Sequence, residues 1–185
     1  DVKWDHPTSP PAPPLATLQE MVRRIEPQMP KTNCERLYLA APDFAAPEAG
    51  AGRMVNGHIW PMVNGHIIEA VAQARGFTVV YPEWLAFVEL AAMIRHARHI
   101  VGPESPALWL SFFARPGAKV CVLNHPDNAG VALLLGSLGA LGIDATVLAG
   151  TSCDVHAWAP QLSEYEIDEI AFAQFVHSWL RDDTQ

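Results

Sequence analysis

The chain has 185 residues, half of them hydrophobic and 17% charged, which excludes an intrinsically disordered chain and suits one sizeable core. A formal net charge of -8 argues against a nucleic-acid-binding protein, which normally presents a basic face. No apolar run reaches the roughly 20 residues that span a bilayer, so we expect no transmembrane segment and no signal peptide. Three cysteines, an odd and sparse set, do not form a disulfide framework and favour a reducing, cytoplasmic location.

The first 14 residues include a proline-rich run from Pro7 to Pro14, which favours the polyproline II conformation. Two interpretations of this segment stay open: a disordered terminus, or a connector from an upstream domain. Residues 15–185 are expected to form a single domain.

From residue 15 onward, short β-rich runs alternate with stretches of helical periodicity. Helices are expected at 15–25, 68–75, 84–97, 106–114, 131–141 and 167–180. Strands are expected at 36–41, 77–81, 99–102, 118–123 and 144–148. Strands that alternate with helices are joined by right-handed crossovers into a parallel sheet. The sequence therefore predicts a doubly wound α/β domain, Rossmann-like, with a mostly parallel five-stranded sheet.

A six-residue motif, Met-Val-Asn-Gly-His-Ile, occurs at 54–59 and again at 62–67. Two short copies are too few for a solenoid, so the first copy is read as an inserted loop or a local duplication. The second copy precedes a predicted helix that ends at Gly76 as its C-cap glycine. Asn64 is therefore expected at or near the N-terminus of that helix.

The segment Gly102-Pro103-Glu104-Ser105 follows a central strand, and ligands of such sheets bind outside the carboxyl ends of the strands. We expect Gly102 to let the backbone turn sharply. Glu104 and Ser105 would then begin a helix, where free N–H groups and the helix dipole favour a phosphate. Alternatively, Ser105 only caps the helix and Glu104 only complements its dipole.

Other polar residues give weaker indications. His125 follows the strand at 118–123 and is either a ligand-contacting imidazole or a solvated loop histidine. Cys121 lies within that strand and is expected in the core. The pairs His96/His99 and Cys153/His156 lack a second pair of ligands, so neither a metal site nor a cofactor is expected. Dinucleotide-binding, Walker A and nucleophile-elbow motifs are absent from the sequence.

Several short segments, in a fixed order, resemble the family 61 glycosyltransferases over about residues 35–125. They are Val63-Asn64, Gly76-Phe77, Pro82-Glu83 with Phe87 and Glu89, Ile100-Val101-Gly102-Pro103, and Phe113 with Pro116-Gly117. The resemblance implies the C-terminal, Rossmann-like half of a GT-B enzyme. Such an enzyme transfers a sugar from a nucleotide-sugar donor in polysaccharide, capsule or glycoconjugate synthesis.

The resemblance also implies site residues and partners. Arg53, Asn64, Glu83, Gly102 and Ser105 would bind substrate, and no tightly bound metal is obligatory. Glu104 and His125 are the candidate catalytic residues. The implied partners are the nucleotide-sugar donor and a glycan or lipid-linked acceptor, with a possible upstream domain or homo-oligomer.

The chain departs from the family pattern at positions that bear on catalysis. Glu104 stands where the family carries histidine, Ser105-Pro106 replace Gly-Ser, and Leu90 replaces a glutamine. A carboxylate in this turn would repel a phosphate unless it is protonated or has another role. Two alternatives therefore stay open beside the transferase: a non-catalytic binding or assembly module descended from one, and an unrelated Rossmann-like domain.

Overall fold

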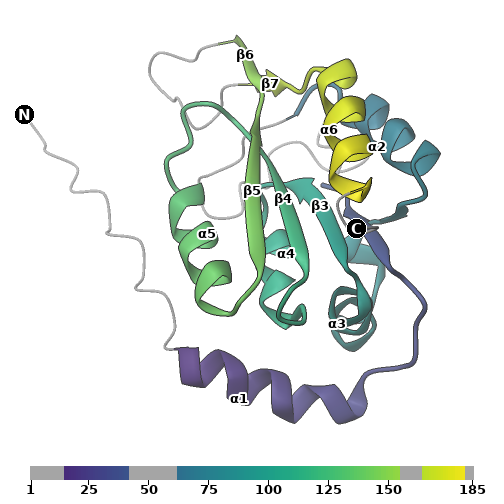
Figure 1. Cartoon of the computed structure of the whole chain (residues 1–185), viewed down its shortest axis with the longest axis vertical. Coiled ribbons are helices and arrows are strands. Elements are labelled where there is room, and N and C mark those ends of the chain that lie inside the picture. The colour runs from purple at the N-terminus through teal and green to yellow at the C-terminus, as the bar shows by residue number, and fades with distance from the viewer. Residues whose placement is uncertain (1–14, 42–61, 155–163, 182–185) are drawn as a thin grey trace, which may run out of the picture.

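The computed structural model describes residues 15–41, 62–154 and 164–181. Five parallel strands form its central sheet, in the order β2-β1-β3-β4-β5 (Figure 1). These strands are β1 (Arg36–Leu39), β2 (Thr78–Val80), β3 (His99–Pro103), β4 (Lys119–Asn124) and β5 (Asp144–Ala149). The expected doubly wound, parallel α/β fold is confirmed.

Six α-helices and three short 3-10 helices connect or flank these strands in the described part of the chain. The α-helices are α1 (Leu15–Ile25), α2 (Gly65–Ala74), α3 (Phe87–His96), α4 (Pro106–Trp109), α5 (Val131–Ala140) and α6 (Glu169–Arg181). The 3-10 helices are η1 (Glu26–Gln28), η2 (Pro82–Trp84) and η3 (Leu110–Phe113). No helix among the described residues is long and apolar enough to cross a membrane.

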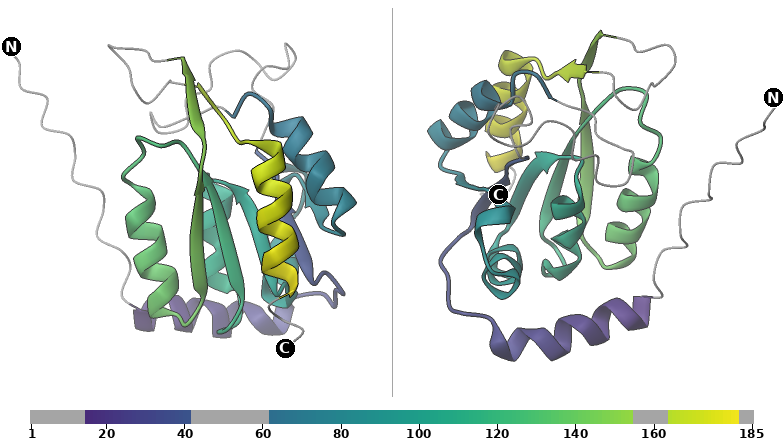
Figure 2. Two further views of the ribbon diagram at one scale, coloured as in Figure 1. Left: turned by 45° about the horizontal axis from the view of Figure 1, so that its top comes forward. Right: turned by 180° about the vertical axis from the view of Figure 1, so that it is seen from behind.

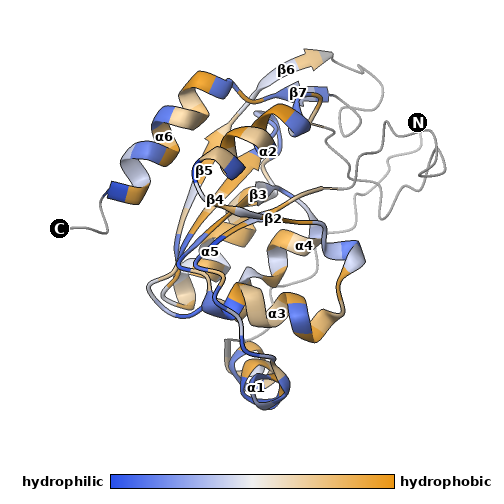
Figure 3. Ribbon diagram, turned by 90° about the vertical axis from the view of Figure 1, so that its right-hand side faces the viewer, coloured by the Kyte–Doolittle hydropathy of each residue, from blue (hydrophilic) through white to orange (hydrophobic). Residues whose placement is uncertain are grey.

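The helices cover both faces of the sheet, as Figure 2 shows in two further views. Side chains of α3, α4 and α5 pack on one face, and those of α2 and α6 pack on the other. Along β4, Val120 and Val122 point to the first layer, while Cys121 and Leu123 point to the second. Strands buried on both faces need continuous apolar runs, and the strands are hydrophobic along most of their length in Figure 3. Cys121 is buried, which confirms its expected place in the core.

The ends of the parallel strands form two opposite sides of the domain. The side with the carboxyl ends of the strands is called the carboxyl edge, and the side with their amino ends is called the amino edge. α1 crosses the amino edge (Figures 1 and 2). Leu18 is the buried residue of α1, and Val22 and Ile25 pack against the core. An ion pair between Arg95 Nε and Glu26 Oε1 at 2.9 Å fixes the end of α1 to α3.

The first residues of three helices bear on the site, and local side-chain hydrogen bonds set the start of two of them, α3 and α6. α2 begins directly after Asn64, as expected, and Gly76 follows its C-cap with a φ of +80°. α3 begins at Phe87 rather than at residue 84, because Pro82–Trp84 form η2 and the Glu89 side chain accepts a hydrogen bond from the Ala86 N–H at 3.1 Å. α6 begins at Glu169 rather than at residue 167, because the Asp168 carboxylate accepts from the Ala171 N–H at 2.8 Å.

Two features beyond the sheet differ from the prediction. The helix expected at 106–114 is α-helical only to Trp109 and continues as η3. The chain after β5 forms an antiparallel pair, β6 (Thr151–Asp154) with β7 (Glu164–Glu166), which was not expected. Gly150 permits this arrangement, because a Cβ there would lie 2.4 Å from the Glu166 main-chain oxygen.

Candidate functional site

The order of the strands reverses between β1 and β3, because β1 is followed in the chain by β2 on one side and β3 lies on the other. Doubly wound sheets bind ligands in the crevice at such a point. The segment from Gly102 to Ser105 leaves β3 at this point. The candidate functional site is therefore described around it, at the carboxyl edge.

Gly102 does not make the sharp turn expected of it. The residue lies inside β3, which continues to Pro103, and it pairs in register with Val122 of β4. A Cβ on Gly102 would lie 2.6 Å from the Leu39 main-chain oxygen and 3.2 Å from the Leu39 Cβ. Glycine is needed here because β1 and β3 approach closely where the strand order reverses, and not because of its backbone angles.

Glu104 and Ser105 leave the strand with their side chains engaged. The Glu104 N–H donates to the Leu123 oxygen at 2.9 Å, and the Glu104 carboxylate accepts from Trp109 Nε1 at 3.1 Å. The Ser105 hydroxyl accepts from the Leu108 N–H at 3.3 Å and caps α4. The structure thus contains the capping contact of the alternative interpretation. α4 is a single turn long, so its dipole contributes little to binding an anion.

His125 follows β4 and lies under Tyr165 of β7. Its side chain is 1% exposed, and its ring meets the Tyr165 ring edge-on at 5.8 Å between centroids. The Asp127 N–H donates to Nδ1 at 3.1 Å, so the neutral ring carries its proton on Nε2. Burial lowers the pKa of His125, and the charge of Asp127 acts in the opposite direction.

Tyr165 joins the segments after β3 and β4. Its hydroxyl donates to the Leu123 oxygen at 3.2 Å, so this carbonyl accepts from both Tyr165 and Glu104. Burial, and to a lesser extent the nearby Glu104 carboxylate, raise the pKa of Tyr165. The hydroxyl therefore stays protonated at neutral pH and acts as a donor.

The loop after β4 is held by reciprocal amide contacts. Asn124 Nδ2 donates to the Asn128 main-chain oxygen at 3.1 Å, and Asn128 Nδ2 donates to Asn124 Oδ1 at 3.0 Å. Asn128 Oδ1 also accepts from the Gly130 N–H at 3.0 Å. These contacts fix the position of His125 and of the first turn of α5.

The side-chain amide of Asn64 makes two hydrogen bonds to the main chain of one residue, Ile167. Its Nδ2 donates to the Ile167 oxygen at 2.7 Å, and its Oδ1 accepts from the Ile167 N–H at 3.1 Å. The neighbouring Val63 N–H donates to the Tyr165 oxygen at 2.9 Å. Asn64 therefore ties the start of α2 to the start of α6, and this amide is already satisfied without a ligand.

The remaining predicted residues lie apart from this cluster. Glu83 is an exposed residue of η2, beyond the edge strand β2, and β1 separates it from β3. Arg53 lies outside the described residues. The structure thus brings together Gly102, Glu104, Ser105 and His125.

Trp109 and Tyr165 complete the cluster, and the sequence prediction did not include them in the site. Trp109 is an apolar side chain within a predicted helix, for which packing in the core is the usual role, and its ring does pack against the core. Tyr165 has a usable signal in the sequence: residues 164–167, Glu-Tyr-Glu-Ile, alternate polar and apolar side chains, as a half-buried strand does.

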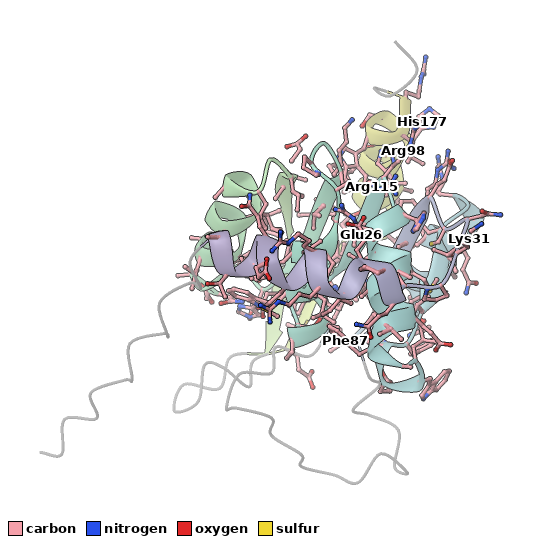
Figure 4. All side chains as sticks on the ribbon, turned by 90° about the horizontal axis from the view of Figure 1, so that it is seen from below. Glu26, Lys31, Phe87, Arg98, Arg115 and His177 are labelled. Carbon is pink, nitrogen blue, oxygen red and sulfur yellow. The ribbon has the colours of Figure 1, made fainter. Side chains whose placement is uncertain are left out.

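Charge is separated between the two edges. In residues 15–41, 62–154 and 164–181, every lysine and arginine lies on α1, in the connection from η1 to β1, at the entrance to a strand or at the end of a helix. Figure 4, a view from below, shows Lys31, Arg98, Arg115 and His177 around this amino edge. The carboxyl edge carries carboxylates instead, namely those of Glu83, Glu104, Asp127, Asp168 and Glu169. No group of three or more potential metal-ligating side chains occurs in the described part of the chain.

No model of a known protein family matches this chain, and no curated protein matches it either. Its function therefore has to follow from the residues of the site. These offer a carboxylate, a buried neutral imidazole and several main-chain N–H groups next to the strand reversal.

Proposed function

We propose that this chain is the donor-binding, Rossmann-like half of a glycosyltransferase that acts in polysaccharide or glycoconjugate synthesis. One observation carries the proposal. Glu104 and His125 follow the adjacent strands β3 and β4 at the carboxyl edge, beside the strand reversal, and Tyr165 links the two segments. Its hydroxyl donates to the Leu123 oxygen that also accepts from the Glu104 N–H, and its ring meets the His125 ring. In this fold, the strand reversal is where a nucleotide ligand binds.

The chemistry assigns a role to each group. Glu104 would accept the proton of the acceptor hydroxyl while that oxygen attacks the anomeric carbon of the sugar. The bond from this carbon to the nucleoside diphosphate then breaks, and the diphosphate leaves with the electron pair. His125 is buried against the Tyr165 ring, so it would position the loop that follows β4, and its lowered pKa keeps it neutral there.

The diphosphate would be bound mainly by main-chain N–H groups. α5 starts directly after the Asn124–Gly130 loop and has no acidic residue in its first turn, in contrast to α3 and α6. Its N-terminus is thus the one beside His125 that favours an anion. Lys3 and Arg53 are the remaining cations of the chain, and Arg53 would supply the positive charge at the diphosphate.

A second candidate function is a non-catalytic binding or assembly module descended from such a transferase. The observation that favours it is the absence of lysine and arginine from the described part of the carboxyl edge. Glu104 and Ser105 also have internal partners, Trp109 and Leu108. A polyanionic ligand would therefore meet negative charge and few unoccupied donors.

Calorimetric titration of the full chain with UDP-, GDP- and CMP-sugars separates the two functions. The transferase proposal predicts that one nucleotide class binds and that Arg53→Ala weakens this binding at least tenfold. Arg98→Ala serves as the matched control, because Arg98 is an exposed arginine at the opposite edge. If none of the three classes binds, the transferase proposal fails, and the non-catalytic module and an unrelated Rossmann-like domain are the two alternatives left.

Turnover then tests the role of Glu104. With the nucleotide class that binds, Glu104→Gln should preserve affinity while abolishing glycosyl transfer to a glycan acceptor. Unchanged transfer by this variant would remove Glu104 as the base.

A further inference from the structure

Two exposed aromatic side chains, Trp84 and Phe87, lie where the chain passes from β2 to α3, and they are here named the aromatic strip. Trp84 is 76% exposed, the largest exposed fraction among the large hydrophobic residues of the described chain, and Phe87 is 45% exposed. Tryptophan is normally buried over most of its surface, because its ring contributes a large apolar area. The open position of Trp84 therefore offers a broad apolar face to a ligand.

The ring of Trp84 is held in place by contacts within the fold. It lies against the Tyr81 ring, with 4.5 Å between the ring centroids and 32° between the ring planes. The Tyr81 hydroxyl donates to Glu69 Oε2 of α2 at 2.7 Å, and the Trp84 N–H donates to the Tyr81 oxygen at 3.0 Å. A side chain that is fixed before binding loses little conformational entropy when a ligand binds, so this ring is suited to recognition.

Carboxylates border the aromatic strip. Glu83 is an exposed residue of η2, next to Trp84, and Glu89 lies in the first turn of α3, which Phe87 begins. This combination suits an uncharged sugar, because the C–H groups on one face of a pyranose pack on an aromatic ring and its hydroxyls donate to carboxylates. The described part of the carboxyl edge has no lysine or arginine, so an anionic ligand would be repelled without compensation.

The aromatic strip leads toward the candidate site. The Phe87 ring meets the Phe113 ring of η3 edge-on, at 5.6 Å between centroids. η3 directly follows α4, whose Trp109 bonds to Glu104. β1 lies between β2 and β3, so two strand spacings, about 10 Å, separate the segments that carry Trp84 and Glu104. A chain of a few sugar rings is long enough to lie on the strip and to reach Glu104.

We propose that the aromatic strip binds the acceptor as an uncharged oligosaccharide, with sugar rings stacked on Trp84 and Phe87 and the reacting hydroxyl at Glu104. This inference rests on the proposed function, because it takes the acceptor from the transferase reaction, and it names the class of that acceptor. The proposed donor site at the N-terminus of α5 follows β4, on the other side of β3. Acceptor and donor would thus approach Glu104 from opposite sides, as the attack of one on the other requires.

Calorimetric titration of the full chain with hexasaccharides tests the inference. The neutral probes are cellohexaose, mannohexaose and chitohexaose, and hexagalacturonate is the anionic probe. We expect a neutral hexasaccharide to bind, with hexagalacturonate at least tenfold weaker. Trp84→Ala should raise the Kd of the neutral hexasaccharide at least tenfold, and Phe87→Ala should raise it by less, because Phe87 is less exposed.

Met21→Ala is the matched control for these variants. Met21 is 44% exposed on α1, at the amino edge, so this variant should bind the hexasaccharide as the parent does. Circular dichroism verifies that each variant is folded. The inference is overturned by a failure of all three neutral probes to bind, by unchanged binding in Trp84→Ala, or by tighter binding of hexagalacturonate. Self-association of the chain that Trp84→Ala abolishes would assign the strip to a second copy and overturn it as well.

Titration with nucleotide-sugars separates this inference from the proposed function. Trp84→Ala should leave the affinity for the nucleotide-sugar unchanged, and a loss of both affinities would overturn the assignment of Trp84 to the acceptor. Nucleotide-sugar binding without hexasaccharide binding would overturn the acceptor site alone. Hexasaccharide binding without nucleotide-sugar binding would overturn the transferase and leave the aromatic strip as a binding site for neutral glycans.

Discussion

The carboxyl and amino edges of the sheet differ in charge, and the winding of the chain explains why. Each long helix that connects or returns along this sheet has its N-terminus at the carboxyl edge. Carboxylates there and cations at the other edge each gain about 0.3–1 kcal/mol from the helix dipoles. Glu89 and Glu169 occupy first turns, whereas Arg95 and Arg181 occupy last turns. An anionic ligand, such as the proposed nucleotide-sugar donor, would have few side-chain cations to bind at the described part of this edge and would depend largely on main-chain N–H groups.

The two edges also differ in the contacts that cover the strand ends. At the carboxyl edge, Asn64 and Tyr165 make side-chain hydrogen bonds that link segments distant in the sequence, and Glu104 bonds to Trp109 of the helix that follows it. At the amino edge, α1 lies across the strand ends and is held by apolar contacts and one ion pair to α3. The carboxyl edge should therefore be much more sensitive to substitution than the amino edge.

The largest effect is expected at Gly102. An alanine Cβ would have to displace the Leu39 carbonyl, a main-chain atom, so Gly102→Ala should lower the free energy of unfolding by about 1–3 kcal/mol. Gly136→Ala is the control, because Gly136 lies in α5 with nothing within 4 Å of a new Cβ. That change should stabilise by about 0.5–1 kcal/mol. Urea denaturation measures both, and equal effects would show that β1 and β3 do not approach closely.

Asn64→Ala comes next and decides between a structural and a ligand-binding role for this residue. Loss of two hydrogen bonds to Ile167 should cost about 1–2 kcal/mol of unfolding free energy. Asn64→Asp keeps the acceptor but replaces the donor by a charge facing the Ile167 oxygen, so it should not restore stability. A normal melting temperature for Asn64→Ala, with weakened nucleotide binding, would instead support the donor-binding prediction.

The sequence predicted the sheet well, because buried parallel strands need continuous runs of apolar residues and such runs can be recognised in a sequence. Continuous apolar runs such as Val120 to Leu123 allow few other structures, and all five strands were located from them. The position of Glu104 and Ser105 after a central strand followed from the order of elements, whereas the strand order that puts them at the reversal came from the structure. Gly102 was misjudged because a glycine needed for turning and one needed for a close approach are identical in a sequence.

The rest of the site depends on contacts between residues far apart in the chain. Asn64 and Ile167 are 103 positions apart, and the Tyr165 hydroxyl reaches a carbonyl 42 positions away. Spacing along the chain carries no record of such pairs. Helix starts were shifted for a local reason: Glu89, in the first turn of α3, accepts from the Ala86 N–H, and Asp168 caps the helix α6 that follows it.

Replacing two buried tyrosines by phenylalanine should change stability by smaller amounts, and each variant serves as the control for the other. Tyr165→Phe loses the bond to the Leu123 oxygen and should cost about 0.5–1.5 kcal/mol. Tyr38 is also fully buried, but its hydroxyl has no hydrogen-bond partner in the described part of the chain. Burial raises the pKa of Tyr38 well above its ordinary value, so the hydroxyl stays protonated. Tyr38→Phe should therefore be neutral or stabilising. Thermal denaturation compares the variants, and an equal loss in both would contradict the assigned role of Tyr165.

Substitutions at the amino edge should lower the free energy of unfolding by less. Arg95→Ala removes the ion pair with Glu26 and the bond from Arg95 Nη1 to the Ala114 oxygen, for about 0.5–1 kcal/mol at low salt. The loss of stability should be smaller in 0.5 M salt. Glu26 is exposed, and the Debye length at this salt concentration is about half a nanometre, so dissolved ions screen the ion pair. Arg24→Ala, which breaks an exposed pair with Glu20 on α1 alone, is the control and should have almost no effect. A larger loss for Arg95→Ala than for Gly102→Ala would reverse the ranking of the two edges.

The smallest effect is a pH dependence that originates at His125. Burial lowers the pKa of this imidazole in the folded chain, so the unfolded chain takes up a proton first as the pH falls below about 6.5. The stabilisation that neutral His125 provides is thus complete above that pH and is lost as the pH falls toward the folded-state pKa. His125→Asn keeps an acceptor for the Asp127 N–H but does not titrate, so its stability should fall less between pH 7 and pH 5. Chemical denaturation of both proteins across this range measures the difference, and parallel curves would mean that the carboxyl edge does not disfavour the charged ring.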